Sequence, residues 1–313
     1  MKLIDLHCDT IDRLMLDRVN SNLRSNDFCV DIEKLRKGDS LAQTFALYFD
    51  LDSTKNPYNY CRSMADKFFE EMDKNKEYIK LATNYDEILK NDKEGKLSAL
   101  LAIEEGGAIE GKIENLQKFY NIGVRMMTLT WNYKNEIGYP NKGEGNIDRG
   151  LTHFGIEVVQ KMNELGMLVD VSHLSDAGFY DVAKHSKHPF IATHSNARRV
   201  TGHLRNLTDD MIKVLANKGG ITGINFCAAF IGTNGKYSYI EDMVKHIKHL
   251  KNVGGIDIIA MGTDFDGIDS TVEIKDISEM DKLVIALKKE GFTLDEIEKI
   301  YYKNALRVIK EVL

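Results

Sequence analysis

Two residues near the start of the chain, His7 and Asp9, have side chains that commonly bind metal ions. They end a short apolar run that begins at Lys2. In a β-strand, side chains two positions apart point to the same face, so both residues can hold one ion while Cys8 points away. Imidazole and carboxylate are good Zn²⁺ ligands. A single His-x-Asp motif often arises by chance. The hypothesis of a metal site therefore requires further ligand residues elsewhere in the chain.

Residues of the same chemical types end four further apolar runs. These residues are Glu104, Glu105, Asp170, His173, His194, Asp264 and Asp266. Packing of an apolar core does not explain ligand-type residues at the ends of five runs. If these ends meet in space, the sequence predicts a metal site there.

The apolar runs have the length of buried strands, and most of them are almost continuously apolar. They are Lys2–His7, Ala42–Phe49, Leu97–Glu105, Val124–Thr130, Met167–His173, Phe190–His194, Gly220–Phe226 and Ile256–Thr263. Continuous apolar runs are typical of parallel strands that are covered on both faces. The segments between them show helical periodicity, for example Ile240, Met243, Val244, Ile247 and Leu250.

Eight strands that alternate with helices predict a (β/α)8 barrel, with a doubly wound open sheet as the competing fold. Active residues of such barrels lie at the carboxyl ends of the strands, where the polar residues occur here. We expect two helices in Asp50–Asp92 and a long loop on the active face at Trp131–Gly150. Residues 1–313 are expected to form a single domain.

Composition narrows the classes of function. The net charge of −6 argues against a nucleic-acid partner, which normally requires a basic patch. No apolar stretch approaches the length of a membrane-spanning helix, and the start lacks a secretory signal. Four cysteines without a CxxC pair are expected to be reduced thiols. We therefore expect a cytoplasmic enzyme with no membrane partner, and the sequence leaves a homodimer open.

Most of the chain resembles the membrane (renal-type) dipeptidases, the M19 metallopeptidases of the amidohydrolase superfamily. The similar segments are LIDLHCDT, IEEGGAIEG, GLTHFGIEVVQKMNELGMLVDVSHLS, PFIATHSNARRV, RNLTDD, INF, GTDFDG and KNALRVI. The resemblance implies a zinc-dependent dipeptidase that hydrolyses the peptide bond of a small dipeptide by a metal-bridging hydroxide. It also implies tolerance of a D-residue at the C-terminal position.

The resemblance further implies two Zn²⁺ ions per chain. His7 and Asp9 would hold one ion, and His173 and His194 the other. Glu105 is expected to bridge them, because it directly precedes two glycines as in the Glu-Gly-Gly pattern of the family. Glu104 is the alternative, since adjacent strand residues face opposite sides and only one of the two can point inward.

Four further roles follow from the same resemblance. Asp264 would be the catalytic general acid and base, while Asp266 would be structural. Arg205 would bind the terminal carboxylate of the substrate, a role that suits a planar guanidinium. Trp131 stands where the mammalian enzymes have a substrate-contacting histidine, and we assign it to the substrate site.

Two substitutions on the substrate side leave specificity open. An indole cannot take a proton, so the histidine's role at Trp131 is lost, moved or taken over by the indole N–H. His153 could substitute, although its position at a helix start favours a capping or surface role. Cys227 replaces a tyrosine of the mammalian enzymes.

Two other classes of function compete with a dipeptidase. Another amidohydrolase-type enzyme, acting on a lactone or amide, usually shows His-x-His on the first strand and, in binuclear cases, a modified lysine on the fourth. This chain has His7 and Asp9, and no lysine in Val124–Thr130. A non-catalytic metal-binding protein would be expected to lose the general acid and base or the bridging carboxylate, and both are present.

Overall fold

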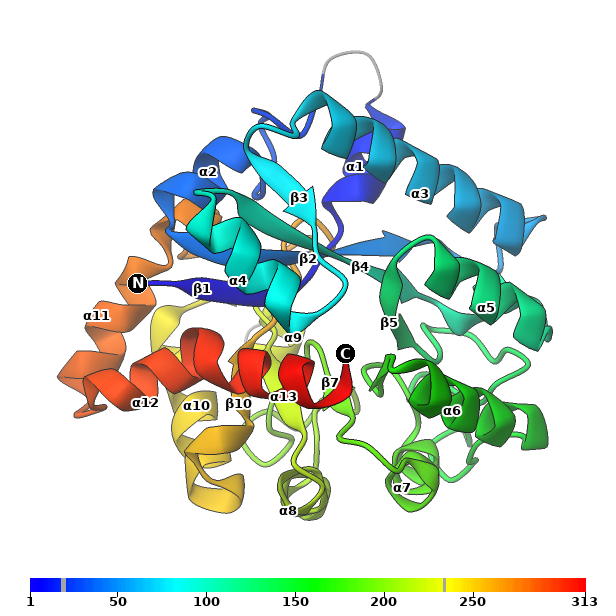
Figure 1. Cartoon of the computed structure of the whole chain (residues 1–313). Helices are drawn as coiled ribbons and strands as arrows, with labels where there is room; N and C mark the ends of the chain where they lie inside the picture. Colours follow the sequence, from blue (N-terminus) through cyan, green and yellow to red (C-terminus); the bar gives the residue numbers. More distant parts are fainter. Residues whose placement is uncertain (18–20, 233–234) are drawn as a thin grey trace.

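The computed structural model describes residues 1–17, 21–232 and 235–313, and a closed barrel of parallel strands forms its centre (Figure 1). The barrel strands are β1 (Leu3–Cys8), β2 (Ser40–Tyr48), β4 (Leu97–Glu104), β5 (Val124–Thr128), β6 (Leu168–Asp170), β7 (Ile191–Ala192), β8 (Ile221–Ile224) and β10 (Ile259–Met261). The barrel closes because β1 pairs with both β2 and β10, and β2 pairs with β4. The predicted (β/α)8 fold is confirmed, and each predicted run overlaps one of these strands.

Three short strands were not predicted. β3 (Ile79–Leu81) pairs with the first residues of β4, and β9 (Tyr237–Ser238) pairs with β11 (Thr271–Val272) in a separate two-stranded sheet. They consist of only two or three residues each. Such short segments have no hydrophobic periodicity to detect.

Helices lie around the barrel and across one of its ends (Figure 1). They are α1 (Thr10–Leu16), α2 (Ile32–Lys37), α3 (Pro57–Lys74), α4 (Tyr85–Lys93), α5 (Ile113–Asn121), α6 (His153–Leu165), α7 (Asp176–His185), α8 (Asp209–Asn217), α9 (Ala228–Ile231), α10 (Ile240–Gly254), α11 (Asp281–Lys289), α12 (Leu294–Glu298) and α13 (Asn304–Val312). Short 3-10 turns occupy Gly106–Ile109, Ile256–Ile258 and Ile277–Glu279, and a π turn occupies Lys299–Lys303. α3 and α4 are the two helices expected in Asp50–Asp92.

Side-chain hydroxyls mark the starts of the helices that follow the active-face loops. Thr152, Ser175 and Thr208 each accept a hydrogen bond from a backbone N–H in the first turn of α6, α7 and α8. Such caps satisfy N–H groups that have no partner within the helix. They fix where each helix begins, and with it the length of the preceding loop.

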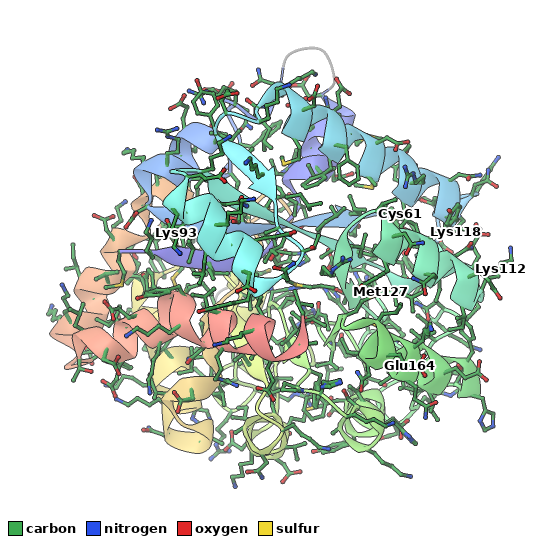
Figure 2. All side chains as sticks on the ribbon, viewed as in Figure 1. Cys61, Lys93, Lys112, Lys118, Met127 and Glu164 are labelled. Carbon is green, nitrogen blue, oxygen red and sulfur yellow. The ribbon has the colours of Figure 1, made fainter. Side chains whose placement is uncertain are left out.

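The apolar residues form two layers. The inner cluster contains Ile4, Leu6, Leu100 and Ala102, and α13 closes its end of the barrel with Val308, Ile309 and Val312. α13 lies across the front of the barrel in Figure 1. The outer cluster lies between strands and helices and includes Met127 and Cys61, whereas Lys112, Lys118 and Glu164 project outward from the helices (Figure 2).

An irregularity in β1 turns His7 towards the barrel axis. Ile4 and Leu6 belong to the inner cluster, so strict alternation would bring Cys8 inward next. The pairing of β1 with β2 instead shifts register between Asp5 and Cys8, and Cys8 joins the outer cluster. Bulges often aim a side chain in this way beside an active site.

Candidate active site

The polar residues predicted to meet do lie together at the carboxyl ends of the strands. His7 comes from β1, Glu104 is the last residue of β4, and His173, His194 and Asp264 follow β6, β7 and β10. Each is less than one-tenth exposed. His173 and Asp264 have positive φ angles of 68° and 62°, which few non-glycine residues adopt. Such conformations often occur at functional sites.

Glu104 is the centre of this group. Its Oε2 lies 3.0 Å from Nε2 of His7, and its Oε1 lies 3.0 Å from Nε2 of His173 and 3.5 Å from Nε2 of His194. Asp9 approaches from the other side, with its Oδ2 3.5 Å from Nε2 of His7. The two oxygens of Glu104 therefore face two different sets of donors.

The expectation that Glu105 faces the histidines is wrong. Glu105 is fully buried, but its carboxylate points away from them and accepts N–H groups from Gly107, Trp131 and Asn135. Glu104 lies two and four positions after Ala102 and Leu100, whose side chains point into the barrel. Alternate residues of a strand share a face, so Glu104 also points inward and Glu105 points to the other face. The Glu-Gly-Gly pattern therefore does not identify the glutamate that faces the histidines.

The donor set fits divalent metal ions. His7, Glu104 and His194 form one group of mutually close donor atoms, and His7, Asp9 and Asp264 form a second. Within the described part of the chain, Oδ1 of Asp9 has no hydrogen-bond partner although it is buried, so it can coordinate an ion. Burial and the nearby Glu104 raise the pKa of Asp9 well above its usual value. Carboxylates buried this closely together are both ionised only where a positive charge lies between them.

A buried carboxylate behind the histidines fixes the orientation of one of them. Asp170 accepts the hydroxyl protons of Thr128 and Thr193, at 2.6 and 2.7 Å. The hydroxyl of Thr193 has no second proton to give, so Nδ1–H of His194 donates to it across 2.7 Å. Nε2 of His194 is then an unprotonated ligand atom that faces Glu104.

Asp264 lies beside the His7 and Asp9 group. Its Oδ2 accepts a hydrogen bond of 2.8 Å from the amide of Asn225. Burial, opposed by His7, raises the pKa of the Asp264 carboxyl to about 6. A carboxyl group with a pKa near neutrality can exchange protons at the working pH of most enzymes.

A cavity of about 740 Å³ opens over these residues. Asp9, Glu104, His173 and Asp264 form part of its wall, together with Tyr48, Trp131, Asn141, Lys142, His203, Arg205, Cys227 and Phe230. The structure therefore brings Arg205, Trp131 and Cys227 to the same cavity as the candidate metal ligands. His153 starts α6 and does not line this cavity.

Arg205 is almost completely buried in the cavity wall. Its two terminal nitrogens donate to the hydroxyl of Ser195 and the carbonyl of His194, both at 3.1 Å. Its Nε is buried without a partner among the described residues. A guanidinium held this rigidly retains donor capacity for a ligand anion.

The whole chain, residues 1–313, matches the membrane dipeptidase family, peptidase family M19. The chain belongs to this family. It is 29% identical to the dipeptidase tcpJ of Claviceps purpurea over 90% of this chain and 69% of that protein. It is 37% identical to an uncharacterized protein from the pqqA 5′ region of Klebsiella pneumoniae, over 70% of this chain and 84% of that protein.

A solved structure extends the likeness to three dimensions. Dipeptidase AC, a metallo peptidase of family M19, is 25% identical and has a TM-score of 0.91 over 100% of this chain and 98% of that chain. Membership in this family makes the chain a metallo-dipeptidase, with a dipeptide as the class of substrate and a metal cofactor. Among the residues that the structure describes, no helix combines the length and apolarity needed to cross a membrane.

Sequence reasoning passed over His203, which also lines the cavity of this M19 dipeptidase. Its Nδ1 accepts the backbone N–H of Arg205 at 3.1 Å, and its ring packs on Phe230 with 4.6 Å between centroids. Burial, with help from Arg205, lowers the pKa of His203. Only its place two residues before Arg205 could have drawn attention to it.

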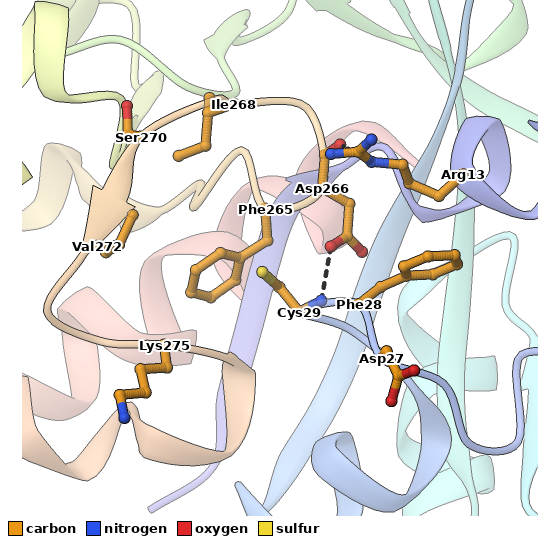
Figure 3. A pocket seen from close by; sticks show the side chains of 10 residues that line it. All are labelled: Arg13, Asp27, Phe28, Cys29, Phe265, Asp266, Ile268, Ser270, Val272 and Lys275. Atoms are coloured by element: carbon orange, nitrogen blue, oxygen red, sulfur yellow. Dashed lines mark hydrogen bonds between the residues drawn. The ribbon is translucent and has the colours of Figure 1, made fainter. Parts of the chain in front are cut away.

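Asp266 has contacts that fit the structural role expected for it. It accepts the hydroxyl of Thr10 at 2.6 Å. It also accepts the backbone N–H of Cys29 at 2.7 Å (Figure 3). Arg13 donates from Nε to the backbone carbonyl of Asp266. These contacts tie the loop after β10 to α1 and to the segment before α2, beside a second cavity of about 290 Å³.

Proposed function

We propose that this M19 dipeptidase binds two zinc ions, one through His7 and Asp9 and the other through His173 and His194. Glu104 bridges them. The position of Glu104 carries the proposal, because one of its oxygens lies 3.0 Å from His7 and the other 3.0 Å from His173. Imidazole and carboxylate donors of this kind are ordinary zinc ligands.

Zinc ions held there would polarise the scissile carbonyl and lower the pKa of the attacking water. Asp264 takes the proton from that water and passes it to the leaving amine. Asn225 donates to Oδ2 of Asp264 at 2.8 Å, which supports this role because the hydrogen bond holds the carboxylate beside His7 and Asp9.

Arg205 binds the C-terminal carboxylate of the dipeptide. Its place in the cavity wall supports this assignment, since a guanidinium can form paired hydrogen bonds with a carboxylate. Trp131 forms part of the wall beside the ligands, with its ring centroid 6.2 Å from that of His173. We further propose that a D-residue is accepted at the C-terminal position.

Metal analysis combined with peptide hydrolysis tests this function. The purified protein should contain two zinc ions per chain and should hydrolyse L-L, L-D and Gly-containing dipeptides, but not tripeptides. His173→Ala should lose metal, whereas Asp264→Asn should keep metal and lose turnover. A metal-loaded protein that is inactive on the whole dipeptide panel would contradict the proposal.

A further inference from the structure

Glu105 has an unusual backbone conformation, with φ 105° and ψ 94°. Residues with a Cβ rarely adopt positive φ, and glycine is the usual occupant of such positions. Glycine stands at the next two positions, yet Glu105 is the residue with the positive φ. Contacts of its side chain must therefore stabilise this conformation.

The carboxylate of Glu105 makes three hydrogen bonds, although the residue is completely buried. It accepts the backbone N–H of Gly107 at 2.6 Å, the backbone N–H of Trp131 at 2.9 Å and the side-chain amide of Asn135 at 2.5 Å. The glycines leave room for it, because a Cβ on Gly107 would lie 2.8 Å from Oε1 of Glu105. All three donors are N–H groups, so only an acceptor with two free oxygens satisfies them together.

Two of these bonds hold the start of the loop 131–150, which contains no α-helix. Asn135 in turn holds the next part of the loop, because its Oδ1 accepts the backbone N–H groups of Ile137 and Gly138. Trp131 itself packs edge-on against Tyr48, with 4.9 Å between ring centroids. The carboxylate of Glu105 is thus the buried anchor of the segment that walls the cavity.

We propose that Glu105 is a positioning residue for the substrate cavity, which holds Trp131 against Tyr48 beside the ligands while the adjacent Glu104 faces the metals. Because the two glutamates are consecutive, the cavity wall and the bridging carboxylate share one short stretch of backbone. The link to catalysis rests on the proposed function. The link to Trp131 rests on the hydrogen bonds alone.

Trp131 is the only tryptophan in the chain, so its fluorescence reports on this contact directly. Glu105→Gln keeps the size of the side chain but exchanges an acceptor for a donor. Glu105→Gly removes the carboxylate and relieves the backbone conformation, which gives a second variant that does not need the strained φ. Glu110→Gln is the matched control, since Glu110 also has a positive φ and accepts a backbone N–H, from Tyr58.

Both Glu105 variants should show red-shifted Trp131 emission and stronger acrylamide quenching, with the metal content of the wild type. Their kcat/KM on dipeptides should fall about 10- to 100-fold, mainly through a higher KM, as expected for a displaced cavity wall. Glu110→Gln should match the wild type in fluorescence and kinetics. Unchanged emission and quenching in both Glu105 variants would overturn the proposal, as would loss of metal with an unchanged tryptophan signal.

The fluorescence measurement tests the anchoring role of Glu105 independently of the proposed function. If the wild type hydrolyses no dipeptide, the proposed function fails, but a red shift in the Glu105 variants would still establish the anchor. If the wild type is an active dipeptidase and the variants neither shift nor lose activity, Glu105 positions nothing.

Discussion

The hydroxyl of Thr193 lies 2.7 Å from Nδ1 of His194 and gives its own proton to Asp170. These two hydrogen bonds fix the proton of His194 on Nδ1 and leave Nε2 free as a ligand atom. Outer partners of this kind hold a metal-binding imidazole in the correct tautomer and orientation.

Thr193→Val should therefore weaken metal binding. Valine keeps the shape of threonine but offers no acceptor to Nδ1–H, and it leaves Asp170 with one hydroxyl donor fewer. We expect the affinity for zinc to fall about 10- to 100-fold, measured by competition with a chromogenic chelator. Thr193→Ser keeps the hydroxyl and should bind zinc like the wild type. Equal affinities for the valine and serine variants would argue against this role.

Asp264→Asn should abolish most turnover without loss of metal. The amide is nearly isosteric but cannot accept a proton, and loss of general acid–base catalysis typically costs ~10²- to 10⁴-fold in rate. Steady-state kinetics on one good dipeptide, with metal content measured on the same sample, tests this prediction.

Asp266→Asn is the control two residues along the chain. It should keep turnover but melt at a lower temperature, because it weakens the contacts with Thr10 and Cys29. Near-normal turnover of Asp264→Asn would remove Asp264 from the proton-transfer step.

Arg205→Lys should discriminate between substrates with and without a free carboxylate. Lysine keeps the charge but loses the planar fork that a carboxylate can share. A hydrogen bond to a charged group contributes ~1.5–3 kcal/mol, so kcat/KM on a dipeptide should fall about 10- to 100-fold. The corresponding dipeptide amide should be a poor substrate for the wild type and should lose little more in the variant. An equal loss on both substrates would show that Arg205 supports the site without binding the carboxylate.

The sequence predicted those parts of the site that follow from strand ends. His7, Asp9, His173, His194 and Asp264 meet because the carboxyl ends of parallel strands converge on one rim of the barrel. The choice between Glu104 and Glu105 failed because it relied on the glycine pattern. The alternation of side chains along β4, with Leu100 and Ala102 pointing inward, would have favoured Glu104.

Other features could not be read from local patterns. Strict alternation with Ile4 and Leu6 would have turned His7 outward, and only the pairing of β1 with β2 reveals the irregularity that reverses it. The burial of His203 and Arg205 depends on how the loop after β7 packs on Phe230, which is a contact between distant segments. The proton-transfer role of Asp264 stays a prediction until a variant is measured.

His246 is completely buried in α10. Its spacing from Met243 and Leu250 already places it on the apolar face. Nδ1 accepts the backbone N–H of Ala197 at 3.0 Å, and Nε2–H faces the carbonyl of Ile231 at 3.1 Å. The imidazole thus joins the loop after β7 to α10 in its neutral form.

This burial makes the stability of the protein depend on pH. Burial lowers the pKa of His246 to about 4, against 6.5 for an ordinary histidine, so the unfolded chain binds the extra proton between these values. Stability from His246 is therefore complete above about pH 6.5 and is lost as the pH falls towards 4. The pKa difference corresponds to roughly 3 kcal/mol over the whole interval.

His246→Gln removes this titration. At pH 7 the variant should unfold more easily than the wild type, because glutamine cannot make both hydrogen bonds in the same geometry. As the pH falls from 7 to 5, the wild type alone loses the His246 contribution, so the difference in unfolding free energy between the two proteins should shrink. Urea denaturation at several pH values, on samples saturated with zinc, measures that difference. If the difference stays constant from pH 7 to 5, the buried imidazole does not titrate on unfolding and the linkage to His246 is wrong.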